Sequence, residues 1–168
     1  MASIASISSQ PKGIAPDRFE RFLAVAAIIL LAVVLTAIGR GHGQWGQVPG
    51  LVWFHLLTIL VALALTPVML LRRRGDGRHR WLGWVWSGAL FLTALDSFLL
   101  HGPGSRFSII HILSIFTLIQ VPVIVLSARR HDLKHHRRSV RGMVTGALLI
   151  AGFFTFPFDR MLGHWLFG

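Results

Sequence analysis

Three ionisable side chains interrupt apolar segments that are long enough to cross a membrane. His55 lies near the start of segment 51–71, Asp96 near the end of segment 81–100, and His111 near the start of segment 107–126. A helix of about 20 residues spans about 30 Å, the thickness of the hydrocarbon core of a bilayer. A polar side chain in that layer is costly unless it faces protein or a cavity, so each of the three is a candidate functional residue.

The positions of these residues along their segments predict that they share one layer. Each histidine lies four residues into its segment, and Asp96 lies four residues before Leu100. Segments 51–71 and 107–126 run in one direction and segment 81–100 in the other, which places all three about 6 Å below the same membrane face. Small and polar residues at helical spacing accompany them, including Thr58 and Thr93, and predict that these faces point into a bundle.

Three interpretations fit this layer, and the residues alone do not decide among them. Two facing histidines suit the axial ligation of a b-type haem, with Asp96 accepting an N–H from a ligand imidazole. The set of His55, His111 and Asp96 could instead bind a metal ion such as Fe or Zn. The third interpretation is structural, with the three side chains hydrogen-bonding one another to fix helix packing.

A second set of histidines lies at the opposite membrane edge. His79 comes just before segment 81–100, and His135 and His136 come before segment 142–156. His79 could pair with either of the other two across helices, although histidines among arginines at a membrane edge are usually solvated. We expect His42, His101 and His164 on the outer surface.

The composition indicates an all-α integral membrane bundle. Hydrophobic residues make up 54% of the 168 residues, charged residues make up 14%, and the mean hydropathy is +0.65. Such a chain is typical of a multi-pass membrane protein. Segment 22–39 exceeds the usual 7–15 residue apolar core of a signal peptide, which favours a retained helix. We expect a flexible tail (1–21), a first transmembrane helix (22–39), a four-helix core (51–158) and a short outer tail (159–168), with five spans in all.

The basic residues predict the orientation of this bundle. Of the 17 Lys and Arg residues, all but Arg40, Arg106 and Arg160 lie in the N-terminal tail or in the loops 72–80 and 128–141. The positive-inside rule therefore places the N-terminus in the cytoplasm, with the protein in a bacterial inner membrane. The net charge of +11 then reflects topology and anionic lipid, and we expect no nucleic-acid partner. The expected partners are the bilayer and a membrane complex or a second copy.

Other function classes are restricted by what the sequence lacks. With no cysteine, the chain has no disulfide, no iron–sulfur cluster and no thiolate metal site. We find no nucleophile motif and no inverted repeat of the kind that transporters use. Whether the protein is an enzyme stays open. Besides electron transfer, the alternatives are a small-solute or proton pathway that uses Asp96, and a structural subunit of a larger complex.

Short motifs at the basic edge give a resemblance to known families. The motif RHRWLG at 78–83, the motif HHRR at 135–138 and His55 resemble an uncharacterised bacterial multi-pass membrane family, domain of unknown function 2306, over 51–158. More distantly, one histidine at each of four consecutive helices resembles cytochrome b-561, a di-haem electron carrier. That resemblance implies haem b held by His55 with His111 and by His79 with His135 or His136. Because the inner histidines are expected in loops, the outer haem is the stronger expectation.

Overall fold

The described part of the chain is helical throughout. The computed structural model describes residues 15–100, 109–157 and 160–168, and within these ranges it contains no strand. The α-helices are α1 (Arg18–Arg40), α2 (Gly50–Leu71), α3 (Gly77–Asp96), α4 (Ile109–Arg129), α5 (Leu133–Met143), α6 (Ala151–Phe153) and α7 (Met161–Phe167). A 3-10 helix η1 (Gly41–Gln47) follows α1, and a π-helix η2 (Val144–Ile150) joins α5 to α6. The predicted all-α class is confirmed for these residues.

Several of these helices have the length and composition of membrane spans. Among the described residues, the segments Arg18–Gln47, Gly50–Leu71 and His111–Arg129 are long and apolar enough to cross a membrane. Large apolar side chains such as Phe22, Ile29 and Ile119 point outward from them, as a lipid-facing surface requires. The chain therefore has the helices of a membrane protein. Helix α3 is less apolar because it begins with charged residues, and α5 is too short to span a membrane by itself, with 11 residues.

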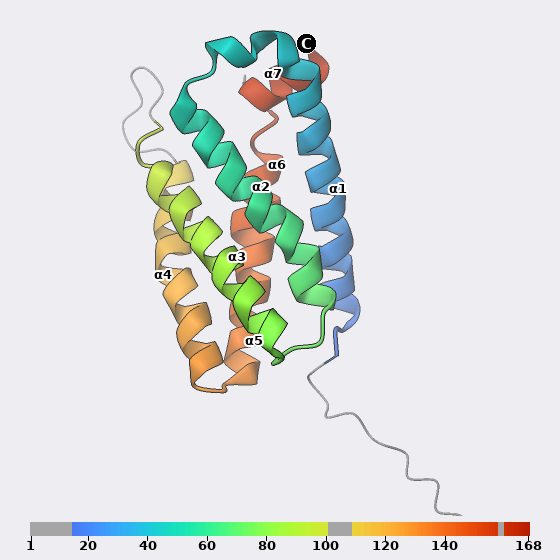
Figure 1. The fold of residues 1–168 in the computed structure, drawn as a ribbon, viewed down its shortest axis with the longest axis vertical. Coiled ribbons are helices and arrows are strands. Elements are labelled where there is room, and N and C mark those ends of the chain that lie inside the picture. The colour runs from blue at the N-terminus through green and yellow to red at the C-terminus, as the bar shows by residue number, and fades with distance from the viewer. Residues whose placement is uncertain (1–14, 101–108, 158–159) are drawn as a thin grey trace, which may run out of the picture.

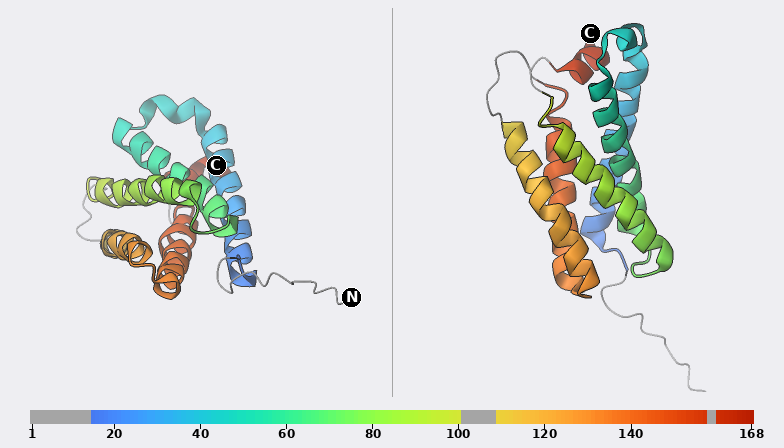
Figure 2. Two further views of the ribbon diagram at one scale, coloured as in Figure 1. Left: turned by 60° about the horizontal axis from the view of Figure 1, so that its bottom comes forward. Right: turned by 60° about the vertical axis from the view of Figure 1, so that its left-hand side comes forward.

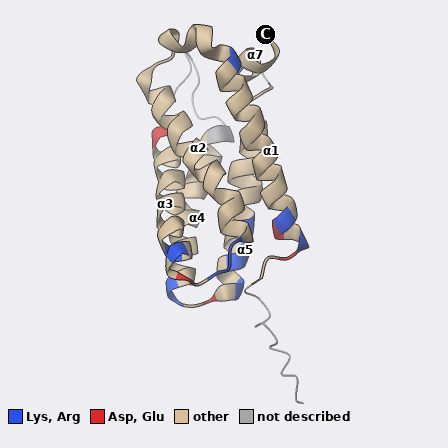
Figure 3. Cartoon of the chain, turned by 45° about the vertical axis from the view of Figure 1, so that its right-hand side comes forward, with Lys and Arg blue, Asp and Glu red and all other residues tan. Residues whose placement is uncertain are grey.

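Helices that follow one another in the chain pack side by side. Contacts join α1 to α2, α2 to α3, α3 to α4 and α4 to α5, and η2 returns to α1, which closes the bundle (Figures 1 and 2). Small and branched side chains fill the interior, among them Ala27, Leu63, Leu90 and Leu148. Most of the described Lys and Arg residues gather at the end of the bundle where α1, α3 and α5 begin, whereas Arg40 and Arg160 lie at the other end (Figure 3). We call this end the basic end.

Two aspartates extend the helices of the basic end beyond their apolar segments. Asp76 caps α3 by accepting a hydrogen bond from the backbone N–H of His79 at 2.7 Å. Asp132 caps α5 in the same way, at 3.0 Å from the backbone nitrogen of His135. Such N-caps satisfy backbone donors that the first helical turn leaves unpaired. The prediction that the inner histidines lie in loops is therefore wrong, because His79, His135 and His136 lie in the first turns of α3 and α5.

The expected outer tail contains a helix that packs across the other end of the bundle. Helix α7 contacts α1 and η1, and its Trp165 donates a hydrogen bond to Gln44 Oε1 at 2.9 Å. A Cβ atom at Gly163 would lie 1.9 Å from the carbonyl oxygen of Phe156. Backbone atoms cannot yield as a flexible side chain can, so this close approach requires glycine.

We expect Gly163→Ala to loosen α7. The overpacking should cost about 1–3 kcal/mol and raise hydrogen exchange of residues 161–168 at least about tenfold. Gly88→Ala is the matched control, because a Cβ there meets nothing within 4 Å and alanine favours an α-helix by about 0.5–1 kcal/mol over glycine. Equal protection of α7 in Gly163→Ala and wild type would contradict the proposed contact.

Candidate functional site

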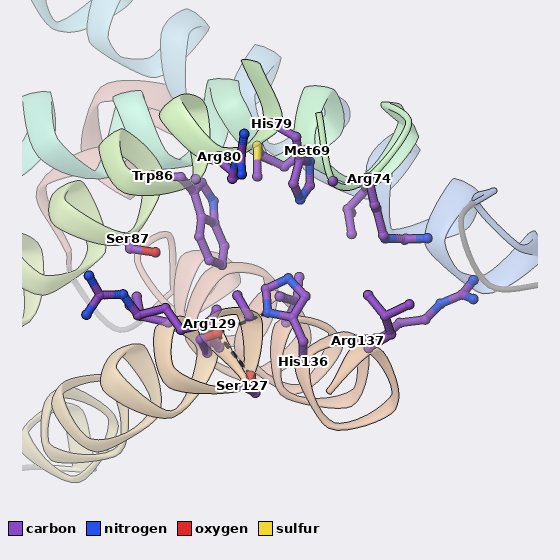
Figure 4. Close-up of a pocket in the computed structure, with 18 of the residues that line it drawn as sticks. Met69, Arg74, His79, Arg80, Trp86, Ser87, Ser127, Arg129, His136 and Arg137 are labelled. Carbon is purple, nitrogen blue, oxygen red and sulfur yellow. Dashed lines mark hydrogen bonds between the residues drawn. The ribbon is translucent and has the colours of Figure 1, made fainter. Parts of the chain in front are cut away.

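A cavity at the basic end brings together two of the histidines that the sequence analysis selected. It has a volume of about 550 Å³ and is lined by residues of α2, α3, α4 and α5, including His79 and His136. Ligand sites in proteins typically measure about 300–1,000 Å³. In Figure 4 the two imidazole rings reach the cavity from opposite walls, His79 from α3 and His136 from α5. We call this space the histidine cavity.

The His136 ring is held in a form that can bind a ligand. Its Nδ1 lies 3.0 Å from the carbonyl oxygen of Ile124 and donates to it, because a carbonyl can only accept. In a neutral imidazole this leaves Nε2 with a free lone pair, the arrangement common in metal-ligating histidines. Burial holds the pKa of His136 below its ordinary value, with Arg74 adding to the effect. The ring is therefore neutral at neutral pH.

The His79 ring is neutral for similar reasons. Burial lowers its pKa, and the nearby positive charge of Arg74 lowers it further. Its Nδ1 is buried and has no hydrogen-bond partner among the residues that the structure describes. A buried polar atom without a partner costs about 1–3 kcal/mol. An imidazole in this state has no internal bond to give up when a ligand binds.

The remaining walls of the histidine cavity are apolar, and arginines stand at its ends. Met69, Ile124 and Val144 line it, as does Trp86, whose Nε1 donates to Thr66 Oγ1 at 2.9 Å. Figure 4 places Arg74 and Arg137 at one end and Arg129 at the other. The cavity thus suits a ligand with an apolar body and anionic groups.

A buried carboxylate that the sequence analysis missed borders this cavity. Glu20 of α1 is 1% exposed and accepts from Arg74 at 2.7 Å, from Arg137 Nε at 2.6 Å and from Arg141 at 3.1 Å. These contacts join the start of α1 to the α2–α3 turn and to α5. We call Glu20 and its three arginines the Glu20 cluster. The capping box of Asp17 and Glu20 marks the start of α1, but only the tertiary fold brings the arginines there.

The other end of the bundle holds the His55–Asp96 pair. Asp96 Oδ1 lies 2.5 Å from His55 Nδ1, and Asp96 is 4% exposed. Helix α3 ends at Asp96, four residues earlier than expected. Asp96 Oδ2 is buried without a hydrogen-bond partner among the described residues. The His55 side chain is 27% exposed, so it is the more accessible member of the pair.

His111 lies on the far side of α3 from α2. It is buried on α4, with its ring 5.6 Å from the ring of Phe98, and one turn further along the helix Ser114 Oγ meets Ser97 Oγ at 2.5 Å. Helix α3 therefore makes polar contacts with both neighbours. Among the described residues, no group of three or more His, Asp or Glu side chains is arranged to hold a metal ion. The interpretation as a metal-ion site stays a prediction.

Between these two sites, polar contacts repeat along the α2–α3 interface. Thr93 Oγ1 lies 2.8 Å from Thr58 Oγ1, and the Trp86–Thr66 bond lies two turns further toward the basic end. Thr93 and Thr66 also bond to carbonyls of their own helices. Indole nitrogen is a donor only and cannot pass a proton on. These contacts therefore stabilise helix packing.

A double-mutant cycle measures this packing role. We expect Thr58→Val and Thr93→Val to show a coupling energy of about 0.6 kcal/mol, the average for hydrogen bonds between membrane helices, in unfolding midpoints measured in detergent. Thr36→Val serves as the control, since that exposed hydroxyl donates to Ala32 O of its own helix. A coupling of zero would show that the two hydroxyls do not stabilise the interface.

Of the remaining histidines, His131 also lines the histidine cavity. His135 is exposed and is not part of the cavity lining, so the geometry favours His136 over His135 as the partner of His79. His42 and His164 are exposed near the outer end, and His101 lies outside the described residues. No family model, no curated protein and no solved structure matches this chain.

Proposed function

We propose that the chain is a five-span protein of the bacterial inner membrane that binds b-type haem and transfers electrons. The observation that supports this function best is the pair of half-buried neutral histidines, His79 and His136, in one cavity of about 550 Å³. Neutral imidazoles from two helices are the axial ligands that a b-type haem needs. The apolar walls suit the macrocycle, and arginines at the cavity ends suit its carboxylates.

In this proposal the protein's own residues set the conditions for electron transfer. Haem iron, when bound, would accept and release one electron. The carbonyl of Ile124 keeps His136 in the tautomer that presents Nε2, which makes it a better ligand. The apolar walls limit the access of water, and the Glu20 cluster closes the cavity on the side of α1.

The proposed orientation follows from the distribution of charge. The basic end faces the cytoplasm by the positive-inside rule, so the histidine cavity lies on the cytoplasmic side and the His55–Asp96 pair on the outer side. From the sequence alone, haem is expected between His55 and His111. We now prefer the inner location, because α3 lies between the two helices that bear those residues.

The reduced-minus-oxidised optical spectrum of the detergent-purified protein tests this function. We expect the sharp bands of a b-type haem, in a sample whose haem content is measured separately. A colourless preparation that stays colourless after haem supplementation during expression would refute the proposal.

One observation favours a second function, a proton pathway. A membrane-buried carboxylate oxygen without a partner, such as Asp96 Oδ2, is typical of proton relays. This function predicts pH-driven proton flux in liposomes that Asp96→Asn abolishes. Flux that survives the substitution, or no flux in the wild type, would exclude it.

A further inference from the structure

The charges around the histidine cavity are balanced on one side only. Arg74 and Arg137 form ion pairs with Glu20. Arg80 and Arg129 also line the cavity, but no carboxylate among the described residues lies within 4.0 Å of either. Two uncompensated positive charges therefore stand at the edge formed by α3 and α4.

An exposed tryptophan joins these two arginines. The Arg129 guanidinium lies 5.9 Å from the centroid of the Trp84 ring, close enough for a cation–π contact. Arg80 lies one helical turn before Trp84, on the same face of α3. Trp84 is 58% exposed, although it is among the largest side chains in the chain. Tryptophan beside arginine at the end of a membrane helix is typical of the headgroup layer.

The surface beside this edge is apolar. Phe91, two turns along α3 from Trp84, and Leu126, one turn before Arg129 on α4, are both exposed. The edge therefore combines cations at the level of the headgroups with apolar side chains deeper in the hydrocarbon layer. An amphiphile with an anionic head and long chains matches this arrangement.

We propose that Arg80, Trp84 and Arg129 form a binding site for the phosphate of an anionic phospholipid. The two guanidinium groups pair with the phosphate, the tryptophan ring packs at the glycerol level, and the acyl chains lie along Phe91 and Leu126. Guanidinium groups bind phosphate in a bidentate manner, and each cation near a membrane surface contributes about 1 kcal/mol to the attraction of anionic lipid. Arg80, Trp84 and Arg129 also line the histidine cavity, so this site borders the place proposed for haem.

Native mass spectrometry of the protein from nanodiscs of mixed phosphatidylglycerol and phosphatidylcholine tests this site. We expect wild type to retain phosphatidylglycerol selectively. The selectivity of the double variant Arg80→Gln/Arg129→Gln should be about tenfold lower. Arg78→Gln/Arg130→Gln is the matched control, because it removes the same charge from exposed neighbours on or beside the same helices. It should behave like wild type.

Three results would overturn the proposal. Equal losses in both double variants would mean that diffuse charge attracts the lipid, and equal retention of both lipids by wild type would mean that no site exists. Displacement of the lipid by millimolar inorganic phosphate would indicate a simple anion site. If the first double variant does not fold, Trp84→Ala replaces it and should show a selective loss as well. Optical spectra of the same samples show separately whether haem is bound, so failure of the lipid site and failure of haem binding can be distinguished.

Discussion

Replacing His136 by alanine should remove the haem bands from the optical spectrum, whereas replacing His135 should leave them unchanged. Both histidines lie in the first turn of α5, but only His136 lines the cavity. Loss of a group that merely orients a ligand typically lowers affinity 10–100-fold. Loss of the ligand itself should therefore lower haem retention by more than about 100-fold. The molar ratio of haem to protein, measured after purification, gives the size of this loss.

The comparison with His79 and His55 makes this prediction specific. His79→Ala should reproduce the effect of His136→Ala, since a haem with two axial histidines needs both. His135→Ala controls for changes in charge and helix propensity in the same turn. Bands that survive in His136→Ala but disappear in His55→Ala would move the haem to the outer layer and refute its assignment to the histidine cavity.

The pairing of His55 with Asp96 could be predicted from the sequence because helix geometry is regular. The rise per residue is fixed, so counting from the ends of two antiparallel segments places both residues at one depth. Helical spacing of Thr58 and Thr93 indicated the facing sides in the same way. Depth and face together were enough to bring the two residues together without knowledge of the fold.

Hydropathy predicts starts for α3 and α5 that are too late in the chain, at 81 and 142, whereas the helices begin at Gly77 and Leu133. Residues 77–80 and 133–141 are strongly polar, and polar stretches between apolar segments are usually loops. Asp76 and Asp132, each three residues before a histidine, were the signals that could have corrected this, since aspartate is a preferred N-cap residue. Recognising these caps would have placed His79 and His136 on helices and strengthened the inner site.

The Glu20 cluster could not be predicted from local pattern at all. Arg74 lies 54 residues after Glu20 in the chain, and Arg141 lies 121 residues after it. One glutamate near several arginines is an ordinary composition at a membrane edge. Only the packing of α1 against the rest of the bundle selects which arginines it meets.

Replacing Glu20 by glutamine should therefore destabilise the bundle strongly. Glutamine keeps the size of the side chain but leaves Arg74, Arg137 and Arg141 with a buried neutral partner. Breaking a buried ion pair by removing one member costs about 3–5 kcal/mol, because the remaining charge loses its compensation. We expect a lower midpoint of thermal unfolding in mild detergent, followed by circular dichroism, and earlier exposure of α1 in hydrogen exchange.

Asp17→Asn is the control that separates burial from charge. Asp17 also pairs with Arg137 and Arg141, but its side chain is 46% exposed, and exposed ion pairs contribute about 0–1 kcal/mol. Asparagine also keeps the N-cap of α1, since it caps as well as aspartate. Each variant removes one negative charge beside Arg137 and Arg141, so a larger loss in Glu20→Gln reflects the burial of Glu20. Equal losses would show that the cluster acts through net charge alone, and α1 would then be held to the bundle by its apolar contacts with α2.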